Sequence, residues 1–366
     1  MRLCDEVCRV PPPVGPWAER LLLPVFYRAQ LYRAARRLNR VRVVIAMYHG
    51  FTAADSHQGI ENHEGKHVHV RSFQQHLALL TEHYTVVPLQ DVVRAWTTGS
   101  PLPQRAAVIT IDDGYRSIYS VAYPALKQFQ VPASVFLATD FVDNRRFLWT
   151  DRLEYAVNHA TADVLTVTIG SQALRLDLTD AQSKMAADRR LRSSLKALPQ
   201  EVRDHAVDQI ERAAGCSVYH AAGGTAIYDP LSWSETSEMV RSGLVSIGSH
   251  THTHVIMSRC EPARAADELR VSKHIIEERL GVLCDLFCYP NGRRGDFNST
   301  TRGLLRAHGF SSALTTVYGN NGSDADLFEL RRYNLGKPLV TGEAAVRLSG
   351  LMEMGSALTR SRARTA

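Results

Sequence analysis

Short apolar segments alternate with longer amphipathic segments along most of the chain. The apolar segments are rich in β-branched and aromatic residues, which is typical of buried strands. They read VRVVIAMY, AAVITI, PASVFLA, LVSIGS, DLFCYP, SSALTTV and FELRRYNL. Most of the segments between them repeat apolar residues every three or four positions, which predicts helices that cover a sheet. This order predicts parallel strands, and therefore either an α/β barrel or an open α/β sheet.

One stretch, from about 145 to 230, interrupts this order and is richer in polar residues. It contains DVLTVTIGSQALRLDL, in which Gly170 and Ser171 predict the turn of a β-hairpin. Two polar helices are expected to follow, near 180–197 and 200–214. We interpret the stretch as a mostly helical insertion packed beside the main domain, because a structureless loop of this length would be unusual.

The two ends of the chain carry its basic excess. Residues 17–40 hold six arginines and one glutamate, and the tail 355–366 holds three more arginines, against a net charge of +6 for the whole chain. A helix that starts at Pro24 would separate an apolar face from an arginine face. The apolar face would hold Tyr27, Leu31, Ala34, Ala35 and Leu38, and the other Arg33, Arg36, Arg37 and Arg40. Two interpretations stay open: a helix docked on the domain, or a basic amphipathic helix on an anionic membrane surface.

The composition excludes several classes of protein. With 45% hydrophobic and 22% charged residues it is that of an ordinary globular protein. No run approaches the roughly 20 apolar residues of a membrane-spanning helix. The start, MRLCDEVCRVPPP, lacks the apolar core of a signal peptide, and the six cysteines form no CxxC pair. We therefore expect free thiols and a cytoplasmic location, either away from membranes or peripheral at the inner membrane surface. The body has no basic stripe with stacking aromatics, so we expect no nucleic-acid partner.

Four polar clusters directly follow apolar strands. Asp112-Asp113-Gly114 follows VITI, the histidines of SHTHTH follow LVSIG, YPNG follows DLFC, and His49 follows VVIAMY. Since the carboxyl ends of parallel strands meet at one edge of a sheet, these clusters should converge. Two histidines and a carboxylate are a common set of catalytic metal ligands, and a second carboxylate can serve as general base. Such a site suits hydrolysis of an amide or an ester.

Each cluster also has a simpler interpretation. Asp-Gly is a turn signal, and alternating histidines can be the polar face of a strand. The pattern alone does not select among the three histidines of SHTHTH. The four histidines between residues 50 and 71 lie in a polar stretch that we interpret as a loop.

The motifs VITIDDGYRS, IGSHTHTH and FCYPNG, in this order, resemble the first three motifs of the polysaccharide deacetylase family. The family is also called the NodB-homology domain or carbohydrate esterase family 4. MYHGF, PASVFLAT and FLWTD resemble its exopolysaccharide-type bacterial members. The similarity covers roughly residues 41–340, between an N-terminal arm (1–40) and a C-terminal helix with a basic tail (341–366). It implies a distorted (β/α) barrel with fewer than eight repeats.

The resemblance also implies which residues bind metal. In the family's second motif the two ligands are histidines four positions apart, which selects His250 and His254. His252 is then a spacer or a group that supports the ligands, and the Thr251 hydroxyl is expected to fix the ligand loop. In the first motif the second aspartate is a ligand, here Asp113. The implied metal is Zn²⁺, with Co²⁺, Ni²⁺ or Mn²⁺ as alternatives.

The remaining roles follow from the same comparison. The first aspartate, Asp112, is the general base, and the backbone N–H of Asn291 stabilises the oxyanion. Many members carry an arginine at the position of Cys288 to orient the base, and we expect Arg332 to replace it. The family's late histidine, its general acid, is absent because no histidine follows His308. His49 is a candidate proton donor by position only.

The sequence thus predicts a metal-dependent hydrolase that removes an acetyl or formyl group from an N-acylated sugar. The expected substrate is a polysaccharide or a glycan precursor, including a lipid-linked sugar. Two alternatives remain: a glycan-binding protein that keeps the metal but has lost turnover, and an amidase that acts on a non-sugar substrate.

Overall fold

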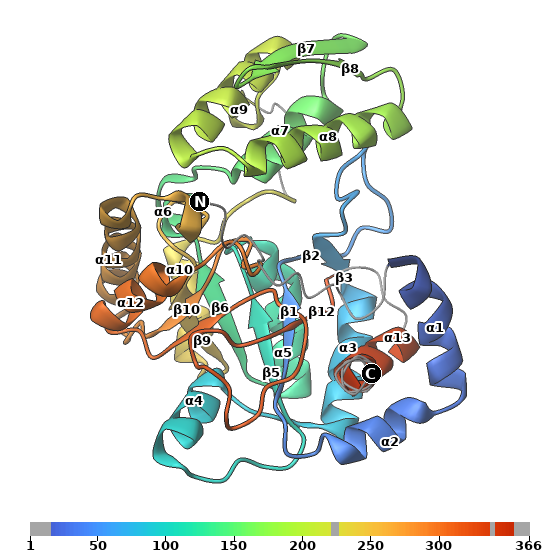
Figure 1. The fold of residues 1–366 in the computed structure, drawn as a ribbon, viewed down its shortest axis with the longest axis vertical. Helices are drawn as coiled ribbons and strands as arrows, with labels where there is room; N and C mark the ends of the chain where they lie inside the picture. Colours follow the sequence, from blue (N-terminus) through green and yellow to red (C-terminus); the bar gives the residue numbers. More distant parts are fainter. Residues whose placement is uncertain (1–15, 221–226, 337–340, 355–366) are drawn as a thin grey trace, which may run out of the picture.

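The computed structural model describes residues 16–220, 227–336 and 341–354. Its centre is an eight-stranded sheet in which all pairings are parallel (Figure 1). The strand order is β11 (Ser312–Leu314), β10 (Leu286–Cys288), β9 (Val245–Ser249), β6 (Ala133–Leu137), β5 (Ala106–Ile111), β1 (Val44–Tyr48) and β12 (Tyr333–Asn334), with β4 (Thr85–Val86) beside β5. The strands predicted from apolar runs therefore form one sheet.

The sheet curls until its two edges are joined by one short segment. Leu330 bridges in parallel to Leu314 of β11, with its carbonyl accepting from the N–H of Thr315 at 2.8 Å. Three residues later Tyr333 pairs with Ala46 of β1. The expected distorted (β/α) barrel is confirmed, although FELRRYNL forms a two-residue strand and a bridge where a longer strand was predicted.

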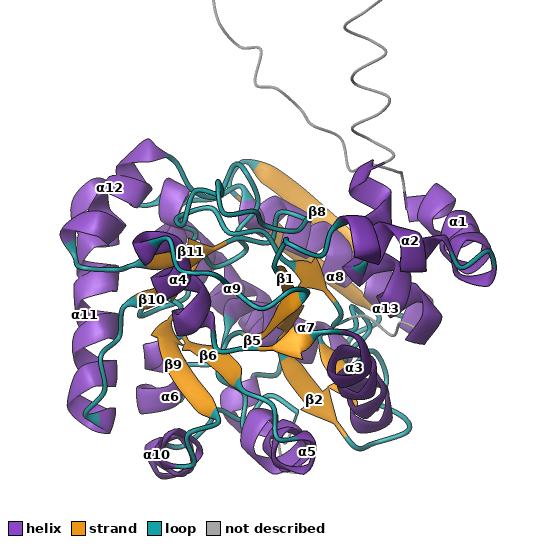
Figure 2. Ribbon diagram, turned by 90° about the horizontal axis from the view of Figure 1, so that it is seen from below, coloured by secondary structure: helices purple, strands orange, loops and turns teal. Residues whose placement is uncertain are grey.

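Both faces of the curled sheet are buried, as near-continuous apolar strands require. One face packs on helices that Figure 2 shows around the outside. These are α3 (Val70–His83), α5 (Tyr123–Phe129), α10 (Trp233–Arg241), α11 (Pro262–Leu280) and α12 (Ser299–Ala307). The other face forms a separate apolar cluster with α4 (Leu89–Thr98). Local signals set the helix ends: α11 begins at a proline and is followed by Gly281 in the left-handed region.

The stretch interpreted as an insertion has a hydrophobic cluster of its own. It contains α7 (Trp149–Asn158), the hairpin β7 (Val164–Ile169) and β8 (Gln172–Asp177), α8 (Ala181–Lys196) and α9 (Gln200–Ala214). The hairpin and the two polar helices match the prediction, and every second residue of β7 is buried. Helix α7 and the preceding α6 (Thr139–Asn144) were not foreseen. The exact limits of the insertion, the arm and the C-terminal segment remain predictions.

The N-terminal helix differs from the prediction. Two helices are present, α1 (Pro16–Arg28) and α2 (Leu31–Leu38), and Pro24 lies inside α1. They are separated at Gln30, whose φ of 54° is left-handed. Helix α2 buries Tyr32 and Ala35, so of the predicted apolar residues in this helix only Ala35 is buried. Its apolar residues Leu31, Ala34 and Leu38 are exposed instead. Helix α1 lies beside α13 (Thr341–Leu348), which contacts α3 (Figure 1).

Three smaller points complete the comparison. The polar stretch 50–71 contains a short parallel pair, β2 (Gly50–Thr52) and β3 (His67–His69), where only a loop was expected. Cysteines 216, 260, 284 and 288 are free thiols, as predicted, whereas the two N-terminal cysteines and the basic tail lie outside the described residues. Within the described ranges, no helix combines the length and the apolar character needed to cross a bilayer.

Substitution of Gly248 tests how tightly the strands that carry the site are packed. A Cβ at this position of β9 would lie 2.6 Å from Phe136 Cε1 and 2.8 Å from the Leu286 carbonyl oxygen, so Gly248→Ala should destabilise the fold by about 1–3 kcal/mol. Gly303→Ala is the matched control, because that position of α12 has no atom within 4 Å and alanine should stabilise the helix by about 0.5–1 kcal/mol. Urea unfolding measures both, and equal stability of the two variants would contradict the packing.

Candidate metal centre

Asp113, His250 and His254 meet at the carboxyl ends of β5 and β9. The Oδ1 atom of Asp113 lies 3.5 Å from Nε2 of His250 and 3.4 Å from Nε2 of His254. One ligand atom from each residue lies within 4.8 Å of the other two. A carboxylate oxygen and two imidazole nitrogens at one point are the donors of many catalytic Zn²⁺ sites. The three residues brought together therefore fit the expected divalent metal.

His252 does not join this group. Its Nδ1 atom lies 2.9 Å from the Thr139 hydroxyl, and its Nε2 atom lies 3.9 Å from Asp140. The Thr251 hydroxyl accepts a hydrogen bond from the N–H of Val255 at 3.2 Å, so it fixes the loop as expected. The alternation of SHTHTH thus directs the first and third histidines to Asp113 and the second to α6.

The neighbouring carboxylate, Asp112, is held by Arg332. Nη1 and Nη2 of the guanidinium donate to the two carboxylate oxygens at 2.8 and 2.7 Å, which is a bidentate ion pair. Both residues are 1% exposed. Arg332 is itself positioned by the Thr315 carbonyl, which accepts from Nε at 2.7 Å. Its Nη2 also lies 3.0 Å from Cys288 Sγ.

Burial and charge oppose each other at the two aspartates. Burial raises the pKa of Asp112, but the Arg332 guanidinium outweighs this effect and leaves the pKa below its usual value. Burial also raises the pKa of Asp113, and hydrogen bonds from His250 and His254 bring it well below the usual value. Both carboxylates are therefore ionised at neutral pH. An ionised Asp113 is what a metal ligand must be, and an ionised Asp112 can accept a proton.

Four non-glycine residues of the site motifs adopt left-handed backbone conformations. The φ angles are 77° at Asp113, 67° at Thr251, 56° at His254 and 59° at Asn291. Such conformations are uncommon for residues with a Cβ, and they concentrate where a surrounding fold over-determines them. The turns after β5, β9 and β10 are therefore shaped to present the motif side chains and backbone groups, at the cost of local strain.

Asn291 follows β10, the neighbour of β9 in the sheet. Its side-chain Nδ2 donates to Asp296, and its carbonyl accepts from the Thr316 hydroxyl at 2.7 Å. Among the described residues, its backbone N–H has no hydrogen-bond acceptor. This N–H is thus available for the oxyanion role inferred from the sequence.

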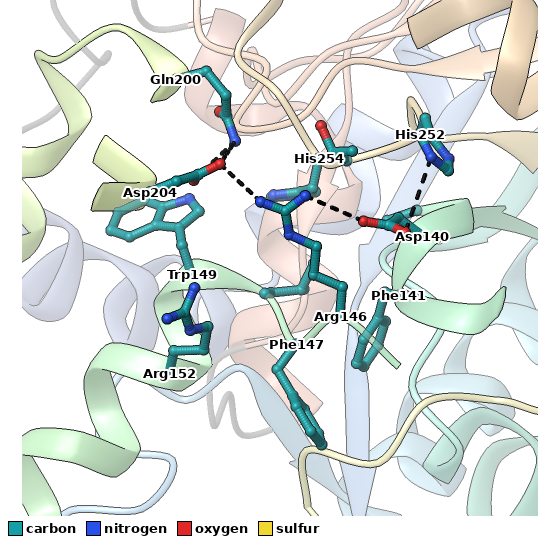
Figure 3. A pocket seen from close by; sticks show the side chains of 13 residues that line it. Asp140, Phe141, Arg146, Phe147, Trp149, Arg152, Gln200, Asp204, His252 and His254 are labelled. Atoms are coloured by element: carbon teal, nitrogen blue, oxygen red, sulfur yellow. Dashed lines mark hydrogen bonds and ion pairs between the residues drawn. The ribbon is translucent and has the colours of Figure 1, made fainter. Parts of the chain in front are cut away.

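A pocket lies between the histidine loop and the insertion (Figure 3). Its walls include Phe147 and Trp149 at the start of the insertion, Gln200 and Asp204 of α9, and His254. Arg146 lies between two carboxylates there, at 3.5 Å from Asp140 and 3.0 Å from Asp204 (Figure 3). An insertion beside the barrel was expected to shape the substrate groove, but the residues of this pocket could not be foreseen because they depend on how the insertion docks.

Two further buried groups near the centre were not singled out from the sequence. Lys66 donates to the Tyr115 hydroxyl at 2.9 Å, and Tyr115 donates to Asp151 at 2.6 Å. His67 is 5% exposed, and its ring packs against Tyr115 with 4.8 Å between centroids. The only sequence signal for the Lys66, Tyr115 and Asp151 group is the position of Tyr115 directly after the Asp-Asp-Gly turn. His49 is also close, since Asp113 and Asp112 both counteract the lowering of its pKa by burial.

Comparison with known proteins agrees with this geometry. A family model described as polysaccharide deacetylase matches residues 99–313. A 67-residue segment is 39% identical to the poly-beta-1,6-N-acetyl-D-glucosamine N-deacetylase of Escherichia coli K12. That segment is 18% of this chain and 10% of the relative, so the chain matches only a small part of the relative's length.

Solved structures show the same fold. The Streptococcus pyogenes deacetylase PplD, in complex with acetate, superimposes with a TM-score of 0.55 at 17% identity, over 84% of this chain and 99% of that one. IcaB from Ammonifex degensii gives a TM-score of 0.53 at 19% identity, over 84% and 97% of the two chains. At these identities the likeness establishes the architecture alone.

The Asp112–Arg332 pair can be tested without an activity assay. Arg332→Met should cost about 3–5 kcal/mol of unfolding free energy, because it leaves a buried carboxylate without its partner. The double variant Asp112→Asn/Arg332→Met should recover part of this loss. Folding lowers the pKa of Asp112. The ion pair therefore stabilises the fold fully at pH values above the unfolded-state pKa of this residue, about 4, and the stabilisation is lost only as the pH falls below that value.

Urea unfolding between pH 5 and 8 measures these differences. Arg302→Met is the control, since its ion pair with Glu329 is only partly buried and should contribute about 1 kcal/mol or less. Strictly additive effects of the two substitutions at residues 112 and 332 would show that the pair is not coupled.

Proposed function

The chain belongs to the polysaccharide deacetylase family, and we propose that it is a metal-dependent hydrolase that removes an acetyl or formyl group from an N-acylated sugar in a polysaccharide or glycan precursor. The observation that carries the proposal is the convergence of Asp113, His250 and His254 beside a carboxylate that Arg332 keeps ionised. Zn²⁺ is the proposed metal, because its usual catalytic ligands include two histidines and one carboxylate; Co²⁺, Ni²⁺ or Mn²⁺ are alternatives.

Each residue of the centre then has one task. Asp113, His250 and His254 would hold the metal, which when bound would supply a water of lowered pKa and polarise the acyl carbonyl. Asp112 takes the proton of the attacking water, and Arg332 keeps this carboxylate ionised and oriented as a positioning residue. The Asn291 N–H donates to the oxyanion that develops on the carbonyl oxygen as water adds to the acyl carbon, which is the kind of interaction that typically contributes about 3–4 kcal/mol.

The residues that line the pocket beside the centre, rather than its enclosed volume, resemble those of a sugar site. The lining combines the aromatic rings of Phe147 and Trp149 with polar groups from Asp140, Gln200 and His252. Carbohydrate sites use this combination, since sugar rings present apolar C–H faces and a rim of hydroxyls. We assign the N-acylated sugar to this pocket, with its acyl group toward His254.

Two aspartate variants separate metal binding from turnover. Asp113→Asn should lose metal, since a neutral amide is a poor substitute for a carboxylate ligand, and acetate release should fall with it. Asp112→Asn should keep the metal but lose about 10²–10⁴-fold in kcat, because no base remains to accept the proton. Metal content by mass spectrometry and acetate release from N-acetylglucosamine oligomers and lipid-linked sugars give the two readouts.

The same assay distinguishes the alternatives. Wild-type turnover by Asp112→Asn would reject the proposed base. Metal-loaded wild-type protein that binds glycans but releases no acetate or formate would favour a glycan-binding protein without turnover. Release from a non-sugar N-acyl amide alone would favour an amidase.

We also propose that α2 contacts an anionic lipid surface. Leu31, Leu38 and Val41 are 45%, 68% and 75% exposed, while Tyr32 and Ala35 dock the helix on the domain. Exposed arginines lie next to this apolar stripe, at positions 33, 37 and 40. Apolar side chains flanked by arginines favour the headgroup region of an anionic membrane.

Vesicle sedimentation tests this contact. Leu31→Ser/Leu38→Ser should weaken binding to vesicles that contain phosphatidylglycerol by about tenfold, because apolar burial contributes to such binding together with charge. Leu283→Ser is the control, since Leu283 is 72% exposed but follows α11. Equal binding of all three proteins, or equal binding to neutral vesicles, would reject the contact.

A further inference from the structure

Helix α9 of the insertion carries an arginine within its buried face. Arg203 is 0% exposed and lies in the same stripe as Val207 and Ile210, which are also fully buried. Within the part of the chain that the structure describes, its Nε and Nη2 atoms have no hydrogen-bond partner. A buried guanidinium normally makes several charge-assisted hydrogen bonds, because an unpaired charge is costly away from water. Arg203 therefore lacks an acceptor that its chemistry requires.

The carboxylates around Arg203 already have other partners. Glu201 accepts from Arg264 at 2.7 Å, and Asp204 accepts from Arg146 and from Gln200, each at 3.0 Å. The contact that Arg203 does make is with Trp149, whose ring centroid lies 5.2 Å from Cζ. A cation–π contact partly offsets the cost of burial but leaves the N–H donors unsatisfied.

Arg203 does not itself line the pocket beside the candidate metal centre, but it packs against Trp149, which does. Trp149, Gln200 and Asp204 line the same pocket as His254 (Figure 3). Nδ1 of His254 is also buried without a hydrogen-bond partner among the described residues, although a ligating histidine usually donates from its second nitrogen. Two unsatisfied buried groups thus lie next to the place assigned to the substrate.

We propose that Arg203 binds an oxyanion group of the substrate, either the carboxylate of a uronic acid or the phosphate that links a sugar to its carrier. This inference rests on the proposed function and narrows its substrate class to an anionic N-acylated glycan. The guanidinium fork matches both groups, since it can donate two parallel hydrogen bonds to a carboxylate or a phosphate. Binding requires the buried Arg203 side chain to turn past Trp149 toward the pocket, and its Nε and Nη2 atoms would break no hydrogen bond in doing so.

The apolar analogue Arg203→Met tests the inference through stability and binding together. Without ligand, Arg203→Met should raise Tm, because a flexible apolar side chain replaces an uncompensated buried charge among apolar neighbours. A purely structural arginine would lower Tm when it is removed. Arg264→Met is the matched control: Arg264 lies near Arg203 but is paired with Glu201 and Glu268, so its loss should leave ligand binding unchanged.

Three small probes define the ligand: N-acetylglucosamine 1-phosphate, glucuronic acid and neutral N-acetylglucosamine. Calorimetric titration of the wild-type protein should give tighter binding of at least one anionic probe than of the neutral sugar. Arg203→Met should weaken that binding by at least about tenfold, as expected for a lost charge-assisted hydrogen bond, and should not change binding of the neutral sugar. Preference for the phosphate probe indicates a carrier-linked sugar, and preference for glucuronic acid indicates a uronate-containing glycan.

The inference is overturned if the wild-type protein binds both anionic probes no better than the neutral sugar, or if Arg203→Met binds them unchanged. Its failure is distinct from failure of the proposed function. Acetate release from neutral oligomers without any anion preference would reject the role of Arg203 and keep the deacetylase. Arg203-dependent anion binding without acetate release from any probe or oligomer would keep the anion site and reject the deacetylase.

Discussion

The buried ion pair between Asp112 and Arg332 links the closure of the barrel to the chemistry of its centre. Arg332 lies between Leu330, which bridges to β11, and Tyr333, which pairs with β1. The segment that joins the two edges of the sheet therefore also delivers the guanidinium to the end of β5. Because both partners are removed from water, neither is tolerated alone, and correct closure is a condition for an ionised Asp112.

The candidate metal centre depends on strained turns that rest on rigid strands. Asp113 and His254 take left-handed conformations immediately beyond or near the ends of β5 and β9, whose residues are almost all buried. Close packing at Gly248 and the Thr251 hydroxyl hold the second turn in place. The buried strands hold these turns in place despite their strained conformations, so the protein itself brings the ligand atoms together. Such preorganisation is expected of a site that must bind a cation at fixed geometry.

Sequence patterns were sufficient to predict an element whose two faces are both buried, and to predict a motif formed by residues adjacent in the chain. The strand AAVITI was predicted to the residue, and the hairpin was predicted from its Gly170-Ser171 turn. The convergence of the Asp112-Asp113 and SHTHTH clusters followed from one rule, that parallel strands present their carboxyl ends at one edge. The choice of Asp113, His250 and His254 within these clusters came from the family resemblance. Prediction failed where tertiary contacts decide which face of a helix is buried. The docked face of α2 is Tyr32 and Ala35 because of what the helix packs against, and no periodicity distinguishes that face from the exposed leucines.

In the insertion, too, the sequence predicts burial but not the contacts of the buried residue, and here those contacts bear on function. A helical pattern predicts that a residue at the position of Arg203 is buried, but a sequence without an alignment gives no reason why a cation should be placed there. In natural proteins the residue type usually agrees with its local environment, and the exceptions concentrate at functional sites. An arginine in an apolar stripe therefore suggests that the side chain binds something. Asp112 and Arg203 represent two outcomes of burying a charge. The first is compensated within the protein and can serve as a base, whereas the second is uncompensated and is best explained by a charge that the substrate brings.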